Sequence, residues 1–122
     1  HILTAATEDH VDRAPYFVYN TVFAEGKAWN AITDTGKDAG AFRAMSVKAA
    51  FGWDALYATP YTKQLARAAG QLSTERGYYA GRYEATGKPN TAVTCNTNAV
   101  VLESLVYRTY GPLMNPTAVR AE

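Results

Sequence analysis

Residues 41–72 constrain the fold most, because they carry two helical patterns with almost no link between them. Over residues 41–57, apolar side chains recur at helical spacing. The stripe consists of Phe42, Met45, Ala49, Trp53 and Leu56, and is broadened by Val47, Ala50 and Phe51. Thr59-Pro60 is a typical cap and first turn, and predicts a second helix over residues 60–72. Two helices joined so closely predict an antiparallel αα-hairpin.

The first of these helices is apolar over much of its circumference, so we expect it to be buried on more than one side. Asp38 is its candidate N-cap. Three charged residues interrupt the apolar pattern: Arg43, Lys48 and Asp54. Each needs a partner if it is buried.

The rest of the chain predicts one more helix and little regular structure besides. A helix over residues 98–110 ends at Gly111-Pro112. Residues 16–32 read as a short β-hairpin or an ordered loop. Residues 1–13 are polar and predict a solvated arm, with a copper site at His1 and His10 as the less favoured alternative. The fold class predicted is therefore mainly α.

Composition and charge exclude several classes of function. The 122 residues allow one domain with a real core, since 48% are apolar. The net charge is +1, from 12 basic and 11 acidic residues with no basic cluster, which argues against nucleic acid as a partner. No apolar run approaches the about 18 residues of a membrane span. The single cysteine, Cys95, allows no internal disulfide, and we expect no metal and no cofactor.

The chemistry-bearing stretch is Gly77–Glu84, which holds three tyrosines, an arginine and a glutamate. In an extended strand, Tyr79, Gly81 and Tyr83 would share one face. Gly81 then leaves a gap for a ring-shaped ligand or for another backbone. The side-chain amides of Asn96 and Asn98 follow, in a turn at the start of the third helix. Flat rings with planar amides favour a sugar-binding surface; the alternative is a hairpin that packs on helices while the amides cap the third helix.

The predicted site residues follow from this surface. Those predicted to bind substrate are Tyr78, Tyr79, Arg82, Tyr83, Asn96 and Asn98, with Trp29 as an outer wall. For Trp29 the sequence favours a buried anchor for its loop over a place on the binding surface. Glycoside hydrolysis normally needs two carboxyl groups. The candidates are Glu84, Glu103 and Asp9, with Asp34 and Asp54 also present, but no pair of them is assigned as catalytic.

Several ordered segments carry a resemblance to a known family. They are Glu8-Asp9-His10, residues 15–20, residues 46–52, residues 77–81 and residues 96–103. In this order they resemble the C-terminal part of a bacterial family of unknown function, itself similar to glucoamylase-like proteins. The resemblance implies αα-hairpins as part of an α/α-toroid-like domain, a periplasmic or extracellular location, and action on polysaccharides.

The resemblance also predicts how much of a domain these residues would form. A toroid of six hairpins needs on the order of 300 residues, so residues 1–122 would be a single domain or a fragment of a larger toroid. The expected function is a carbohydrate-active, glycoside-hydrolase-like module that binds a polysaccharide or oligosaccharide and helps to cleave it. The alternative is a non-catalytic structural subunit that associates with further copies of itself or with the missing part of the domain.

Overall fold

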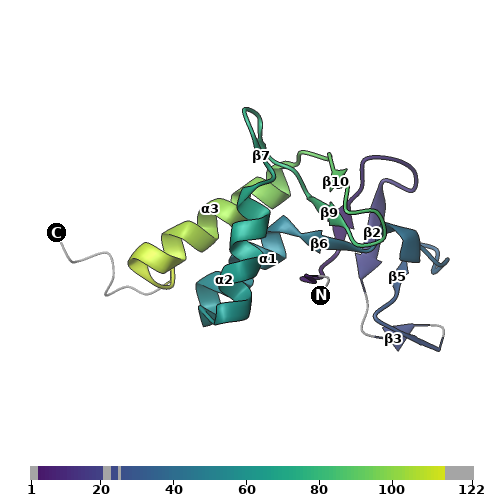
Figure 1. Ribbon diagram of the computed structural model, residues 1–122, viewed down its shortest axis with the longest axis horizontal. Helices are drawn as coiled ribbons and strands as arrows, with labels where there is room; N and C mark the ends of the chain where they lie inside the picture. The colour runs from purple at the N-terminus through teal and green to yellow at the C-terminus, as the bar shows by residue number, and fades with distance from the viewer. Residues whose placement is uncertain (1–2, 21–22, 25, 115–122) are drawn as a thin grey trace.

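The computed structural model describes residues 3–20, 23–24 and 26–114. Its three α-helices lie on one side of the molecule and most strands on the other (Figure 1). The helices are α1 (Val47–Tyr57), α2 (Pro60–Gly70) and α3 (Cys95–Tyr110), preceded by a 3-10 helix, η1 (Gly40–Phe42). Helix α1 packs against both α2 and α3, as its broad apolar surface predicts.

The strands are short and form small antiparallel sheets. One sheet has the order β1 (Asp9–His10), β2 (Phe17–Asn20), β5 (Ala31–Ile32). A second has the order β10 (Pro89–Asn90), β9 (Gly81–Tyr83), β6 (Ala44–Ser46). Two further pairs are β3 (Phe23–Ala24) with β4 (Lys27–Ala28), and β7 (Ser73–Thr74) with β8 (Gly77–Tyr78). The hairpin expected within residues 16–32 is present, because β2 pairs with β5.

The predicted mainly α, toroid-like class is wrong: the described residues form a small mixed α/β domain, and no toroid of helices is evident in them. Residues 41–46 do not extend α1. They form η1 and then β6, which pairs with β9 so that Ser46 lies opposite Gly81. Pairing with a strand some 40 residues away overrides the local helical pattern here.

The helix starts show which of the predicted capping residues are correct. Thr59 caps α2 as predicted, since its hydroxyl accepts a hydrogen bond from the Thr62 amide at 3.1 Å. Asp38 caps no helix beginning at residue 41; its carboxylate accepts from the Gly40 amide at 2.9 Å, beside η1. Helix α3 begins three residues earlier than predicted, because the Thr94 hydroxyl accepts from the Thr97 amide.

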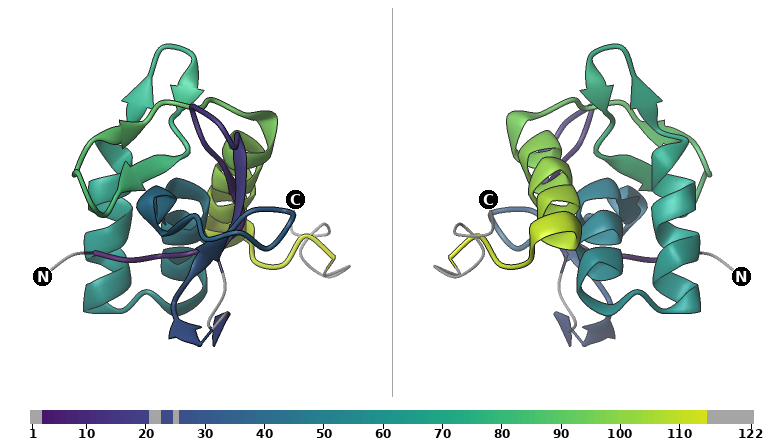
Figure 2. Two further views of the ribbon diagram at one scale, coloured as in Figure 1. Left: turned by 90° about the vertical axis from the view of Figure 1, so that its right-hand side faces the viewer. Right: turned by 90° about the vertical axis from the view of Figure 1, so that its left-hand side faces the viewer.

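The N-terminal segment is not a solvated arm. Along residues 4–9, exposed side chains at even positions alternate with inward-facing ones at odd positions, and Ala5 and Asp9 are buried. The Ser46 amide donates to the Ala5 carbonyl at 2.8 Å, and β1 pairs with β2. Figure 2 shows this segment, in purple, passing alongside α2 on its way to the sheet. His1, named above for copper, lies outside the described residues.

Two clusters of buried side chains make the core. The helical cluster contains Ala5, Met45, Val47, Ala50, Leu65, Ala69, Leu72 and Val101. The strand cluster contains Val11, Val18, Ala31, Ala39 and Tyr83. Asp54, buried on α1, joins all three helices: its carboxylate accepts from the Thr62 hydroxyl at 3.2 Å and pairs with Arg108 at 3.0 Å. Lys48 is also buried and has partners, as predicted, while Arg43 is only half-buried and pairs with Glu84.

Within the described residues, no helix combines the length and apolar character needed to cross a bilayer. The same residues hold no group of three or more His, Cys, Asp or Glu side chains placed to bind a metal ion.

Candidate functional site

The tyrosine stretch is not one strand, because its two halves belong to different sheets. Asn98 holds the first half in place: its side-chain carbonyl accepts from the Tyr78 amide at 2.8 Å, and its amide donates to the Thr94 carbonyl at 2.9 Å. At Gly81 the gap is filled by another backbone, that of Met45. Asn98 and Gly81 therefore serve the fold.

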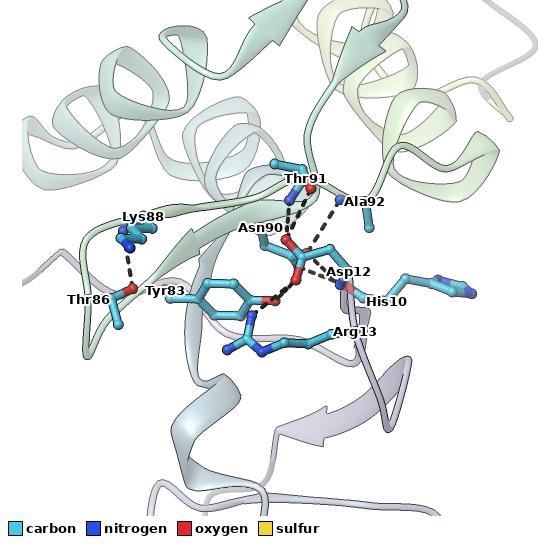
Figure 3. A network of polar contacts seen from close by, with 9 residues as sticks. All are labelled: His10, Asp12, Arg13, Tyr83, Thr86, Lys88, Asn90, Thr91 and Ala92. Atoms are coloured by element: carbon cyan, nitrogen blue, oxygen red, sulfur yellow. Dashed lines mark hydrogen bonds and ion pairs between the residues drawn. The ribbon is translucent and has the colours of Figure 1, made fainter.

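Tyr83 is also part of the fold, since only 2% of it is exposed. Its hydroxyl donates to the Asp12 carboxylate at 2.7 Å, and the Arg13 guanidinium lies 4.7 Å from its ring centroid (Figure 3). Burial, together with the hydrogen bond to Asp12, raises the pKa of Tyr83 to about 12. Partial burial acts to raise the pKa of Asp12, but hydrogen bonds from Thr91 and Tyr83 outweigh it and lower that pKa.

The other predicted binding residues divide among several surfaces. Tyr78 is half-buried and packs edge-on against Phe51, at 5.3 Å between centroids. Tyr79 lines one hollow, with Thr74, Glu75, Arg76, Thr91 and Val93. Arg82, Tyr83 and Glu84 line another, of about 260 Å³, with Leu3, Met45, Ala68 and Gly87. Trp29 is exposed and lines a small hollow with Glu84. Asn96 belongs to a separate cleft, so the structure does not join all seven into one site.

The three carboxyl groups named for catalysis have different surroundings. Glu84 pairs with Arg43 at 3.0 Å, while Glu103 is exposed on α3 and lines a different hollow. Asp9 is buried and accepts a hydrogen bond from the Ser46 hydroxyl at 2.8 Å; burial raises its pKa. None of the hollows described here is lined by two of the three, whereas glycoside hydrolysis normally uses a pair of carboxyl groups that flank the bond.

A cleft of about 350 Å³ lies where the N-terminal segment meets α1 and α3. We call it the Trp53 cleft. It is lined by Ala6, Thr7, Glu8, Lys48, Ala49, Gly52, Trp53, Leu56, Asn96 and Val100. Gly52 faces open space, since a Cβ built there would meet no other atom within 4 Å. The volume is in the range of small-molecule sites.

The polar wall of the cleft is built around Lys48, of which only 7% is exposed. Its ammonium donates to the Asn96 side-chain carbonyl at 2.7 Å and lies 3.7 Å from the Glu8 carboxylate. The hydrogen bond from the Thr7 hydroxyl, at 2.8 Å, is the main cause that lowers the pKa of Glu8, and Lys48 adds to it. An ammonium, an amide and a carboxylate are therefore held in defined positions.

The apolar wall of the cleft is built from α1 and α3. Trp53 is 45% exposed, and its ring stacks on Tyr57 with centroids 5.3 Å apart and planes at 24°. Leu56 and Val100 continue this wall. The stacking orients the indole, so a flat aromatic surface stands next to the polar wall.

Of the residues in the Trp53 cleft, the sequence had pointed only to Asn96 as a binding residue. Trp53 reads as core in a helical stripe, and Glu8 as part of a polar arm. Lys48 carried the one usable signal, as a charge within an apolar helix that needs a partner.

The structure thus defines a small mixed α/β domain with an open cleft between the N-terminal segment, α1 and the first turns of α3. The chain belongs to the family described as "Protein of unknown function (DUF3131)", whose model matches residues 1–111. No curated protein and no solved structure matches the chain. The expected membership in a family of unknown function is confirmed, whereas the comparisons show no link to glucoamylase-like proteins.

Proposed function

We propose that this domain binds a saccharide in the Trp53 cleft. The observation that carries the proposal is the half-exposed indole of Trp53 beside a buried, hydrogen-bonded ammonium at Lys48. A pyranose offers an apolar C–H face on one side and hydroxyl groups around its edge. An aromatic platform next to fixed polar groups matches both features.

The polar wall matches sugar hydroxyls because each of its groups is already oriented before a ligand arrives. Lys48 offers a donor, and Glu8 offers acceptors on a carboxylate whose lowered pKa keeps it charged. Asn96, on the first turn of α3, adds an amide. Groups held in place lose little conformational entropy on binding, so they favour affinity.

The proposed activity is binding. Among the described residues that line the cleft, Glu8 supplies the carboxylate, and it is engaged by Thr7 and Lys48. Glycoside hydrolysis by the usual routes needs a second carboxyl group on the other side of the scissile bond.

Removing the Trp53 ring is expected to weaken saccharide binding about tenfold or more, because stacking and ring burial are lost together. Isothermal titration of the wild type and Trp53→Ala with glucan and chitin oligosaccharides measures this. Tyr110→Ala is the matched control, since that ring is exposed at the far end of α3 and does not line the cleft. Equal affinities for all three proteins, or no binding by the wild type, would refute the proposal; melting curves check that each variant is folded.

A second candidate function, self-association, is favoured by apolar side chains exposed on the helices. Leu102 is 64% exposed and Tyr110 70%, and Leu105 and Val106 lie on the same helix. Exposed apolar surface of this kind often marks an interface. We propose a second copy of this chain as its partner. Sedimentation equilibrium should then show a dimer that Leu102→Glu dissociates, and a 13.3 kDa monomer at every concentration would contradict it.

A further inference from the structure

Ala6 lies at the border of two hollows. It lines the Trp53 cleft, and it also lines the small hollow that contains Trp29. Since Ala6 is exposed and its side chain is a single methyl group, nothing large separates the two hollows at this point. Trp53 and Trp29 thus stand at two ends of one surface that passes over the N-terminal segment.

The segment between them is held in place by hydrogen bonds and forms what we call the track. Thr4, Ala6 and Glu8 face solvent, while Ala5 and Asp9 are buried, as in an extended chain with a period of two. Two hydrogen bonds hold the backbone of this segment. The Ser46 amide donates to the Ala5 carbonyl, and the Tyr61 hydroxyl accepts from the Thr4 amide at 3.1 Å. Four residues of extended chain span at most about 14 Å.

The Trp29 end carries the same kinds of group as the Trp53 end. The Trp29 indole is 59% exposed, beside an ion pair in which Arg43 lies 3.0 Å from the Glu84 carboxylate. The Thr4 hydroxyl donates to that carboxylate at 2.9 Å, which holds it in place. The hollow itself measures only about 10 Å³, too little for a sugar ring, so a ligand at this end meets the exposed Trp29 ring from outside the hollow.

The geometry points to an extended glycan chain as the ligand, lying along residues 4–8 and contacting both Trp53 and Trp29. The inference rests on the proposed saccharide binding and narrows its ligand to a chain of several sugar units. A single sugar fills the Trp53 cleft alone. A longer chain continues over Ala6 and stacks on the exposed Trp29 ring, where Glu84 and Arg43 contact its hydroxyl groups.

The test is the dependence of affinity on ligand length, measured by isothermal titration with glucan oligosaccharides of increasing length. For the wild type, affinity should rise with length until the chain reaches Trp29 and then level off. Trp29→Ala should lower affinity for the long oligosaccharides about tenfold while leaving that for the shortest unchanged. Tyr16→Ala is the matched control, because Tyr16 is also an exposed aromatic residue with a left-handed backbone conformation.

A second variant tests the middle of the track, where Ala6 borders both hollows. Ala6→Arg places a long side chain on the exposed face and should weaken long oligosaccharides more than short ones. Affinity independent of length, or an equal loss for all lengths in Trp29→Ala, would overturn the inference while leaving binding at Trp53 intact. Absence of binding at every length would overturn the proposed function and this inference together.

Discussion

Replacing Gly81 with alanine is expected to lower the free energy of unfolding by about 3 kcal/mol or more, which is the upper part of the range for overpacking. A Cβ built at Gly81 would lie 2.4 Å from the Met45 carbonyl oxygen and 3.2 Å from its carbon. Both are backbone atoms of β6, and Ser46 pairs with Gly81 across the two strands. The strands can make room only by giving up this pairing, which also anchors the start of α1.

The measurement is the midpoint and slope of urea unfolding for wild type and variant. Gly70→Ala is the matched control: Gly70 ends α2, and a Cβ there would meet no atom within 4 Å. Alanine in a helix favours the folded state by up to about 1 kcal/mol over glycine. The control should therefore be as stable as the wild type or more so. A Gly81→Ala midpoint equal to that of the control would show that β6 and β9 are not packed as described.

Replacing Asp12 with alanine is the second change with a large expected effect, about 2–3 kcal/mol of lost stability. The Asp12 carboxylate accepts from the Tyr83 hydroxyl at 2.7 Å, from the Thr91 amide at 2.9 Å and from the Thr91 hydroxyl at 3.1 Å (Figure 3). Hydrogen bonds to a charged group contribute about 1.5–3 kcal/mol. Removing the carboxylate leaves the buried Tyr83 hydroxyl without this acceptor.

The pH dependence of stability separates the charge of Asp12 from its shape. Folding lowers the pKa of Asp12, so its contribution is fully present above the unfolded pKa of about 3.9 and is lost as the pH falls through the folded value. Asp12→Asn keeps the shape without the charge. The difference in melting temperature between wild type and Asp12→Asn should shrink below about pH 4. A difference that stays constant into acid would contradict the assigned role of the charge.

The parts of the fold that the sequence predicts are those set by local chemistry. The Thr59-Pro60 signal places the start of α2 correctly, because the capping hydrogen bond spans only three residues. Gly111 ends α3 for a similar reason. The pairing of β2 with β5 also agrees with the expected hairpin.

The parts that escaped prediction depend on contacts between distant segments. Residues 44–46 carry a helical pattern, yet they form β6 because β9 and Ala5 satisfy their backbone groups. The Trp53 cleft draws on three segments, so its composition cannot be read from any one stretch. Trp53 shares a helical stripe with core residues, yet its ring is half exposed. This exposure depends on how α1 packs against α3, which the stripe does not show.

The most direct test of saccharide binding in the Trp53 cleft is an NMR titration of the labelled protein with a glucan oligosaccharide. The predicted result is that the Trp53 indole signal and the backbone amides of Glu8, Lys48, Gly52 and Asn96 shift together and saturate with one affinity, while signals from Tyr78 to Tyr83 stay in place. Shifts centred on Tyr78 to Tyr83, or no shift at the Trp53 indole at saturation, would contradict the assignment of the site.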